Sequence, residues 1–189
     1  MIDPEVLLAG YATGIFPMAD KDGSISWYSP DPRAIIPLDR YNIPRSTRQL
    51  QKSGRFRIQI DTCYTSVMRG CASRDETWIS GGIIESYVNL FRLGYAHSVE
   101  SFDEEGLAGG LYGVALGSAF FGESMFSFRS GASKVALAFL LEHMRQKGFT
   151  LLDVQYMTPH LSMFGAVEIP RDEYIAQLNE ATRKITSFV

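Results

Sequence analysis

The sequence has few cysteines and histidines and no long apolar run. Its two cysteines and three histidines among 189 residues give neither a disulfide framework nor a zinc signature. The longest apolar stretch, Val135 to Leu141, is far shorter than the ~20 residues of a membrane-spanning helix. Met1 to Glu5 lack the basic and then apolar order of a secretory signal. These absences predict a cytoplasmic protein with no membrane segment.

Internal repeats, biased tracts and flexible linkers are absent as well. Hydrophobic residues make up 46% and charged residues 21% of the chain, which is typical of a globular protein and excludes a disordered one. The length suits one domain with a small appendage. Six of the eight prolines lie before residue 45, so an extended N-terminal region of residues 1–45 is expected to pack on a core of residues 46–189.

Hydrophobic periodicity beyond the N-terminal region predicts an α+β layer fold. Three strand-like runs separated by short turns indicate an antiparallel meander. A stripe of Leu137, Leu140, Leu141 and Met144 indicates a helix over 132–147. The predicted order is a helix over 4–14, a strand over 56–60, helices over 62–70 and 83–91, strands over 95–102, 107–116 and 119–126, a helix over 132–147, a strand over 150–157 and a helix over 171–178.

Charge is informative only locally, because the net charge of −3 excludes a uniformly basic nucleic-acid binder. One segment carries six basic residues and no acidic partner among them. Such a block suits phosphate contacts. A solvated face whose charges pair with acids elsewhere in the fold is an equal alternative. The residues of this basic block are Arg40, Arg45, Arg48, Lys52, Arg55 and Arg57.

A carboxylate stands in the middle of the strand predicted over 119–126. Strand alternation places Phe121, Glu123 and Met125 on one face. An unpaired buried carboxylate is costly, so Glu123 needs a partner or a ligand. The alternative to a functional site is an internal ion pair with Lys134 or Arg129.

A pair of polar residues lies on the strand predicted over 150–157. Period two places Asp153 and Gln155 on one face and Leu152, Val154 and Tyr156 on the other. Ordinary strands avoid aspartate, so this pair is the best site signal that the residues give by themselves. A polar edge-strand face is the alternative.

Adjacent aromatic residues precede a stiff Ser-Pro-Asp-Pro segment at residues 29–32. Trp27 and Tyr28 can present a ring to a nucleobase, since aromatic rings stack on bases. They can equally cover the edge of a sheet.

Taken in order, the motifs of this sequence resemble those of the leucyl/phenylalanyl-tRNA–protein transferases. The match is collinear from residue 14 to about residue 170, and the order of the motifs decides it more than any one motif. The motifs are Gly14-Ile15-Phe16-Pro17-Met18, Trp27-Tyr28-Ser29-Pro30-Asp31-Pro32-Arg33-Ala34, Gly70-Cys71-Ala72-Ser73 with Thr77-Trp78-Ile79, Ala96-His97-Ser98-Val99-Glu100, Gly109-Gly110-Leu111-Tyr112-Gly113, Gly122-Glu123-Ser124-Met125-Phe126-Ser127, Ala132-Ser133-Lys134, and Asp153-Val154-Gln155 with His160 and Gly165-Ala166.

The resemblance implies a GNAT-like fold, with a mixed and mainly antiparallel sheet flanked by helices. Aminoacyl-tRNA takes the place of acyl-CoA. Family members move Leu or Phe, and less readily Met, from tRNA to the N-terminal α-amine of proteins that begin with Arg or Lys, which marks those proteins for degradation. No metal or organic cofactor is required. The N-terminal region is reduced relative to longer relatives.

The resemblance also assigns roles to residues of this chain. Asp153 and Gln155 match the catalytic pair, and Glu123 matches the acid that holds either the donor α-ammonium group or the adenosine. Tyr28 and Phe102 stand where tryptophans usually contact the terminal adenosine. The basic block becomes the surface for the tRNA acceptor stem. The pocket for the donor side chain is lined by Leu111, Phe120, Met125, Leu137 and Leu140, with Leu140 where Phe is usual.

Two other functions remain open at this point. An acyl-CoA-dependent enzyme of the same fold needs a pyrophosphate loop, and the segment from Arg129 to Lys134 has the wrong glycine spacing for one. A non-catalytic tRNA-binding paralogue is the other alternative, and the intact pair of Asp153 and Gln155 argues against it.

Overall fold

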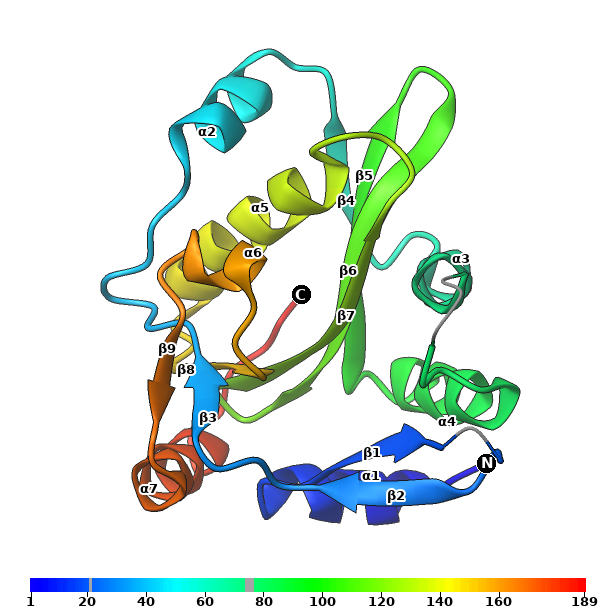
Figure 1. Ribbon diagram of the computed structural model, residues 1–189, viewed down its shortest axis with the longest axis vertical. Helices are drawn as coiled ribbons and strands as arrows, with labels where there is room; N and C mark the ends of the chain where they lie inside the picture. The colour runs from blue at the N-terminus through cyan, green and yellow to red at the C-terminus, as the bar shows by residue number, and fades with distance from the viewer. Residues whose placement is uncertain (21, 74–76) are drawn as a thin grey trace.

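The computed structural model describes residues 1–20, 22–73 and 77–189, which form a seven-stranded sheet, a two-stranded hairpin and helices on both faces of the large sheet (Figure 1). The helices are α1 (Pro4–Ala12), α2 (Arg45–Lys52), α3 (Tyr64–Ala72), α4 (Gly81–Arg92), α5 (Ala132–Lys147), α6 (Pro159–Ser162) and α7 (Arg171–Thr182). The strands are β1 (Phe16–Ala19), β2 (Ile25–Tyr28), β3 (Arg33–Ile35), β4 (Arg57–Ile60), β5 (Ala96–Asp103), β6 (Gly106–Leu116), β7 (Ala119–Ser127), β8 (Leu151–Gln155) and β9 (Val167–Ile169).

The large sheet has the order β4-β5-β6-β7-β8-β3-β9. Its neighbours are antiparallel except β7 and β8, which run parallel and are connected through α5. The predicted α+β class, with a mixed and mainly antiparallel sheet flanked by helices, is therefore confirmed. The predicted meander and the helix over 132–147 are also confirmed, and α7 extends four residues beyond its predicted end at residue 178.

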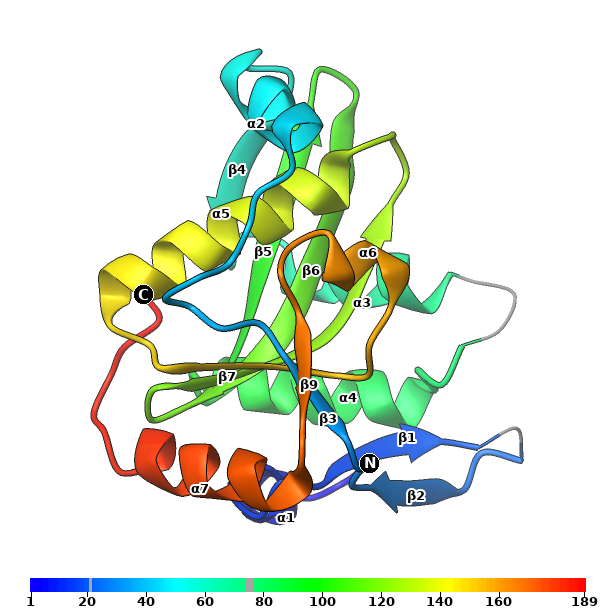
Figure 2. The ribbon, with the colours of Figure 1, turned by 60° about the vertical axis from the view of Figure 1, so that its left-hand side comes forward.

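Each face of the large sheet has its own apolar core. Helices α1, α3, α4 and α7 cover one face, and α5 with α6 covers the other (Figure 2). The predicted stripe on α5 is buried in the second core, which explains why its helical period is so regular. Strands β7 and β8, which carry Glu123, Asp153 and Gln155, lie between these two cores.

The N-terminal region is more regular than its prolines suggested. Strands β1 and β2 form the separate hairpin, and Trp27 of β2 packs on α1, where a Cβ at Gly10 would lie 2.5 Å from its ring. Strand β3 enters the large sheet between β8 and β9. Helix α2 was not predicted because its residues are polar and only Thr47 is buried. The division of the chain at residue 45 stays a prediction.

A β-bulge interrupts the pairing of β6 and β7. Residues 112 and 113 of β6 pair with residues 124 and 122 of β7, which leaves Glu123 without an opposite residue. The two strands approach each other so closely here that only glycine fits on β6: a Cβ at Gly113 would lie 2.3 Å from the carbonyl oxygen of Phe121. The extra residue reverses the alternation of side chains on β7.

The predicted alternation on β7 is therefore wrong beyond Glu123. Phe121 belongs to the core under α1, α3 and α4, on the side to which Glu123 also points. Met125 instead packs against the opposite core, under α5. The bulge thus places the polar side chain of Glu123 and the apolar side chain of Met125 on different faces of the sheet.

Candidate active site

A cavity of about 660 Å³ opens where β7 and β8 separate. The two strands pair only through residues 119–121 and 151–153, and the following residues of both strands line the cavity. Splaying leaves room for a ligand between the two cores. The lining residues from these strands are Gly122, Glu123, Ser124, Met125, Phe126 and Ser127 of β7, Leu152, Val154 and Gln155 of β8, and Tyr156.

The cavity is apolar on the side of α5. Four of the five residues predicted to hold the donor side chain line it: Leu111, Met125, Leu137 and Leu140. The fifth, Phe120, is fully buried and packs against Phe188, with 5.0 Å between the ring centroids, and is not part of the lining. We call the space bounded by these four lining residues the apolar chamber.

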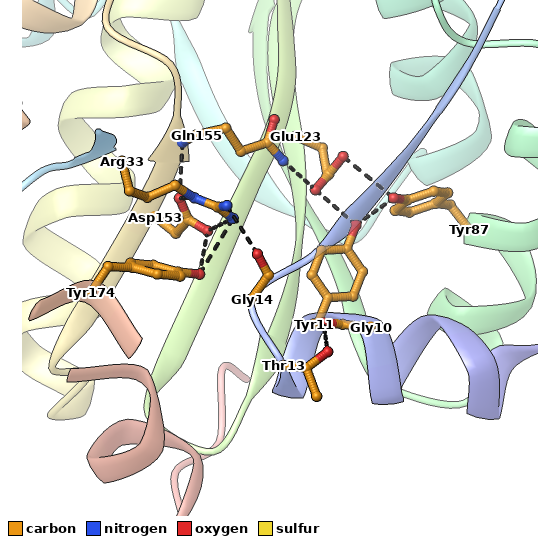
Figure 3. A network of polar contacts seen from close by, with 10 residues as sticks. All are labelled: Gly10, Tyr11, Thr13, Gly14, Arg33, Tyr87, Glu123, Asp153, Gln155 and Tyr174. Atoms are coloured by element: carbon orange, nitrogen blue, oxygen red, sulfur yellow. Dashed lines mark hydrogen bonds and ion pairs between the residues drawn. The ribbon is translucent and has the colours of Figure 1, made fainter. Parts of the chain in front are cut away.

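A buried ion pair with Arg33 holds Asp153 of β8 in place (Figure 3). Its Oδ1 accepts a hydrogen bond from Nε of Arg33 at 2.9 Å, and its Oδ2 accepts from Nη2 of Arg33 at 2.7 Å. The hydroxyl of Tyr174 on α7 also donates to Oδ2, at 2.8 Å. Asp153 is 0% exposed and Arg33 only 1%. The two charges therefore compensate each other inside the protein, as buried charges must.

Arg33 is itself enclosed by the N-terminal region and α7. Its Nη1 donates to the carbonyl oxygen of Gly14 at 3.0 Å. Its guanidinium carbon lies 4.8 Å from the ring centroid of Phe16 and 4.5 Å from that of Tyr174. A planar guanidinium suits this combination of a bidentate carboxylate and two aromatic rings. Arg33 appeared in a motif of the sequence, but its contact with Asp153 was not predicted, because 120 residues separate the two.

Gln155 ends β8 in a left-handed conformation with φ of 66°. Its backbone N–H donates to Oδ1 of Asp153 at 2.9 Å, and its side-chain Nε2 donates to Oε1 of Glu123 at 2.8 Å. The predicted shared face of Asp153 and Gln155 is confirmed. Tyr156 leaves its predicted face, since the chain turns at Gln155, and its ring meets Phe16 edge-on. Asp153 thus orients Gln155 through the backbone.

Glu123 lies at the centre of a network of hydroxyl groups from α1 and α4 (Figure 3). Tyr11 of α1 donates to Oε1 at 2.7 Å, and Tyr87 of α4 donates to Oε2 at 3.3 Å. The two tyrosine hydroxyls also share a hydrogen bond. Burial raises the pKa of Glu123 to about 8, and the nearby charge of Asp153 acts in the same direction, whereas the two tyrosines oppose the shift.

The alternative of an internal ion pair for Glu123 is wrong. Arg129 instead pairs with Asp103, with 2.5 Å between Nε and Oδ2, and with Glu105. In the described part of the chain, Lys134 makes no ion pair with Glu123. The carboxyl group is held by hydroxyls and an amide, and no cation within residues 1–20, 22–73 and 77–189 contacts it directly.

The two residues expected at the adenosine lie outside the cavity lining. Tyr28 packs on Phe16, with 6.2 Å between ring centroids. Phe102 lies at the far end of β5, with the guanidinium of Arg57 5.9 Å from its ring centroid. The structure instead places Met18 and Trp78 in the lining, on the side of Glu123. Both stand in motifs of the sequence, and no local pattern separated them from the other aromatic and apolar positions.

All six side chains of the basic block are exposed, and in the ranges that the structure describes none of them forms a direct ion pair with an acid. Arg55 and Arg57 nevertheless line a cavity together with Asp103, Glu104 and Glu105. The hydrogen bond from Arg129 is the main cause that lowers the pKa of Asp103, and the charge of Arg55 acts in the same direction. The alternative of charges that face acids elsewhere in the fold therefore stays open at this end of the block.

Helix α2, which carries three of the six basic residues, packs through Leu50 on Gly131 at the start of α5. Ser133, two residues further on, lines the cavity. Arg40 lies apart from the others, in a second cavity beside Arg145.

The raised pKa of Glu123 predicts how stability depends on pH. Between its ordinary pKa of 4.5 and the folded value of about 8, the folded chain holds a proton that the unfolded chain releases. The bound proton therefore stabilises the folded state fully below pH 4.5, and this stabilisation is lost as the pH rises through 8. Urea unfolding at intervals from pH 5 to 8.5 should show that the free energy of unfolding falls by a few kcal/mol, since one pKa unit corresponds to about 1.4 kcal/mol.

The matched variant Glu123→Gln keeps the size of the side chain and cannot titrate. Its free energy of unfolding should change less over the same pH interval, and the difference between the two curves isolates Glu123. Parallel curves for the unchanged chain and the variant would contradict the raised pKa.

Solved structures with a similar arrangement of elements include L-PGS from Bacillus licheniformis, with a TM-score of 0.49, 12% identity, and coverage of 83% of this chain and 79% of that chain. A tandem GNAT protein from the clavulanic acid biosynthesis pathway has a TM-score of 0.42 and 13% identity, covering 88% of this chain and 59% of that chain.

Sequence comparison gives a much closer match. A family model described as leucyl/phenylalanyl-tRNA protein transferase matches residues 35–179, and the model of the N-terminal domain of that family matches residues 1–31. The leucyl/phenylalanyl-tRNA–protein transferase of Rubrobacter xylanophilus is 50% identical over 188 residues, which are 99% of this chain and 98% of the relative. That of Chlorobaculum tepidum is 50% identical over 194 residues, covering 100% of both chains. This chain, with its cavity between β7 and β8, belongs to the leucyl/phenylalanyl-tRNA–protein transferase family.

Proposed function

We propose that the chain transfers Leu, and also Phe and Met, from charged tRNA to the N-terminal α-amine of cytoplasmic proteins that begin with Arg or Lys. The products then enter N-degron-dependent degradation. Membership of a transferase family supports the reaction type. None of the helices in the described part of the chain has the length and hydrophobicity to cross a membrane. The observation that carries the proposal is the apolar chamber directly beside Glu123 and Gln155.

The apolar chamber supports an uncharged donor side chain. Its walls are three leucines and a methionine, and methionine adapts its shape to different ligands. A charged side chain would lose its hydration there without a compensating partner. The chamber is therefore suited to Leu, Phe and Met and excludes Asp, Lys and Arg.

Positioning supplies much of the catalysis in this proposal. The donor is an activated ester and the acceptor is an α-amine with a pKa near ~8, so the two need mainly to be held together. Because Nε2 of Gln155 donates to Glu123, its Oε1 is the atom left to accept a hydrogen bond from the attacking amine. Asp153 has no exposed surface and acts as a positioning residue through the backbone of Gln155.

The terminal adenosine and the acceptor stem occupy the remaining surfaces. Trp78 is half-buried at the cavity, its side chain packs against the core under α1, α3 and α4, and its carbonyl oxygen accepts from the N–H of Ala19, so it is placed to stack on the adenine base. The exposed basic residues of α2 lie next to the start of α5 and suit phosphate contacts. Tyr28 and Phe102 have no place in this arrangement of the adenosine.

Transfer of labelled leucine from tRNA to a peptide beginning with Arg tests the proposal. The unchanged chain should transfer the label, and Gln155→Ala should lower turnover at least about tenfold, or ~1.4 kcal/mol, with tRNA binding kept. Gln146→Ala, an exposed glutamine on α5, is the matched control and should keep full turnover. Binding of tRNA without transfer would indicate a non-catalytic paralogue, and transfer from an acyl-CoA instead would indicate the other alternative.

Donor preference should respond to the wall that Leu140 forms. Leu140→Phe narrows the apolar chamber, so the ratio of Leu to Phe transfer should shift toward Leu. Apolar side chains that differ by a methylene are separated by only ~1–3 kcal/mol, so both remain substrates. Competition between leucyl-tRNA and phenylalanyl-tRNA for one Arg peptide measures the ratio. An unchanged ratio, or efficient transfer of a charged amino acid, would show that the donor side chain lies elsewhere.

Binding of tRNA should depend on α2 through charge alone. Arg48→Ala with Lys52→Ala should weaken the binding of leucyl-tRNA and phenylalanyl-tRNA alike, and the salt slope should fall by about one unit for each phosphate that the variant no longer neutralises. Arg183→Ala with Lys184→Ala removes the same charge at the end of α7 and serves as the control. Equal salt slopes for the two double variants would contradict a tRNA surface on α2.

A further inference from the structure

The proposed reaction leaves the route of two protons open. An acceptor α-amine with a pKa near ~8 is largely an ammonium group at neutral pH. To form the amide it must lose two protons, while the 3′ oxygen of the leaving ribose must gain one. Some group beside the ester has to move the first proton, a requirement that rests on the proposed function.

Asp153 cannot take part in this proton transfer. Both of its oxygens are occupied: Oδ1 accepts from Arg33 and from the N–H of Gln155, and Oδ2 accepts from Arg33 and Tyr174. No part of Asp153 reaches the surface of the cavity. A substrate nitrogen would have to displace a bidentate ion pair to reach it.

Glu123 also accepts hydrogen bonds at both oxygens, from Tyr11 and Gln155 at Oε1 and from Tyr87 at Oε2, but it differs from Asp153 in two other respects. It lines the cavity, and in the described ranges no cation forms an ion pair with it. Its Oε1 accepts the amide hydrogen of Gln155, the residue placed to receive the acceptor amine. We propose that Glu123 carries a proton from the acceptor ammonium to the 3′ oxygen of the departing ribose.

The proposed steps balance in atoms and charge. The Glu123 carboxylate takes one proton from the ammonium, and the freed lone pair of the nitrogen forms a bond to the ester carbonyl carbon. The bond between that carbon and the ribose 3′ oxygen then breaks, and the oxygen leaves with the electron pair and takes the proton from Glu123. The nitrogen gives its second proton to the restored carboxylate, which releases it to solvent.

The surroundings of Glu123 bring its proton affinity close to that of an α-amine. Its pKa of about 8 is near the ~8 of the acceptor, and a catalytic acid or base works best when its pKa is near the working pH. Burial is the main cause of the shift, and the surrounding groups adjust it. The titratable or charged groups that face it are Tyr11 of α1, Tyr64 of α3, Tyr87 of α4, Tyr112 of β6, Arg33 of β3 and Asp153 of β8.

Besides Glu123, the described residues of the lining include three titratable side chains, Tyr112, Tyr156 and His160, and of these only His160 ordinarily titrates near neutral pH. It belongs to α6, on the side of α5, and its ring packs on Phe164. Glu123 faces the opposite side, toward α1 and α4. His160 is thus separated from the network of Gln155 and Glu123, and because it also lines the cavity, His160→Gln tests whether this imidazole rather than Glu123 sets the pH dependence.

The pH dependence of single-turnover transfer tests this inference. Leucine transfer to an Arg peptide is measured from about pH 6 to pH 10, with spontaneous hydrolysis of the charged tRNA measured in parallel and subtracted. The reacting state has one proton in total on the Glu123 carboxyl group and the acceptor amine. At low pH both groups are protonated and at high pH neither is, so the rate for the unchanged chain should peak near pH 8 and fall on both sides. His160→Gln should keep this bell shape.

Glu123→Gln should remove the alkaline fall. Its rate should rise only with the neutral amine, reach a plateau, and stay at least about 100-fold below the unchanged chain at the optimum. Tyr11→Phe removes a hydrogen bond that stabilises the carboxylate, so the alkaline limb should move to higher pH. A merely structural role would lower the rate equally at every pH.

The outcomes separate this inference from the proposed function. Absence of transfer by the unchanged chain overturns both. Transfer by the unchanged chain, with the same bell shape kept in Glu123→Gln, overturns the proton route alone. Loss of the alkaline fall in Glu123→Gln, together with its shift in Tyr11→Phe, supports the route.

Discussion

The rest of the site depends on the buried ion pair between Arg33 and Asp153. The pair joins β3, near the start of the chain, to β8, and Tyr174 adds α7 to the same contact. Removing either charge would leave the other buried and unpaired, at a cost of about 3–5 kcal/mol. Because Asp153 also accepts the backbone N–H of Gln155, the same interaction that connects distant segments fixes the left-handed end of β8.

This pairing divides the two carboxylates into different tasks. Asp153 is neutralised and enclosed, so it stabilises and orients. Among the described residues, Glu123 accepts from hydroxyl and amide donors and forms no ion pair, and burial raises its pKa to about 8. The bulge on β7 places this polar group beside an apolar chamber, because it turns Met125 to the opposite face. A reactive ester with a hydrophobic side chain fits such a boundary between polar and apolar walls.

The sequence predicted what local periodicity determines. The meander, α5 and the shared face of Asp153 and Gln155 follow from period two or from the helical period, and all three are confirmed. The bulge at Glu123 was not predictable, since it depends on the close approach of Gly113 to the neighbouring strand. The contact of Arg33 with Asp153 and the place of Trp78 in the cavity depend on tertiary packing, which no short pattern encodes.

A crystal structure with a non-hydrolysable leucyl-adenosine analogue tests the central claim most directly. The claim predicts the leucyl side chain between Leu137 and Leu140, its carbonyl group beside Gln155 and Glu123, and the adenine base on Trp78. A leucyl group found outside the space between β7 and β8, for example in the cavity lined by Arg40 and Arg145, would contradict it.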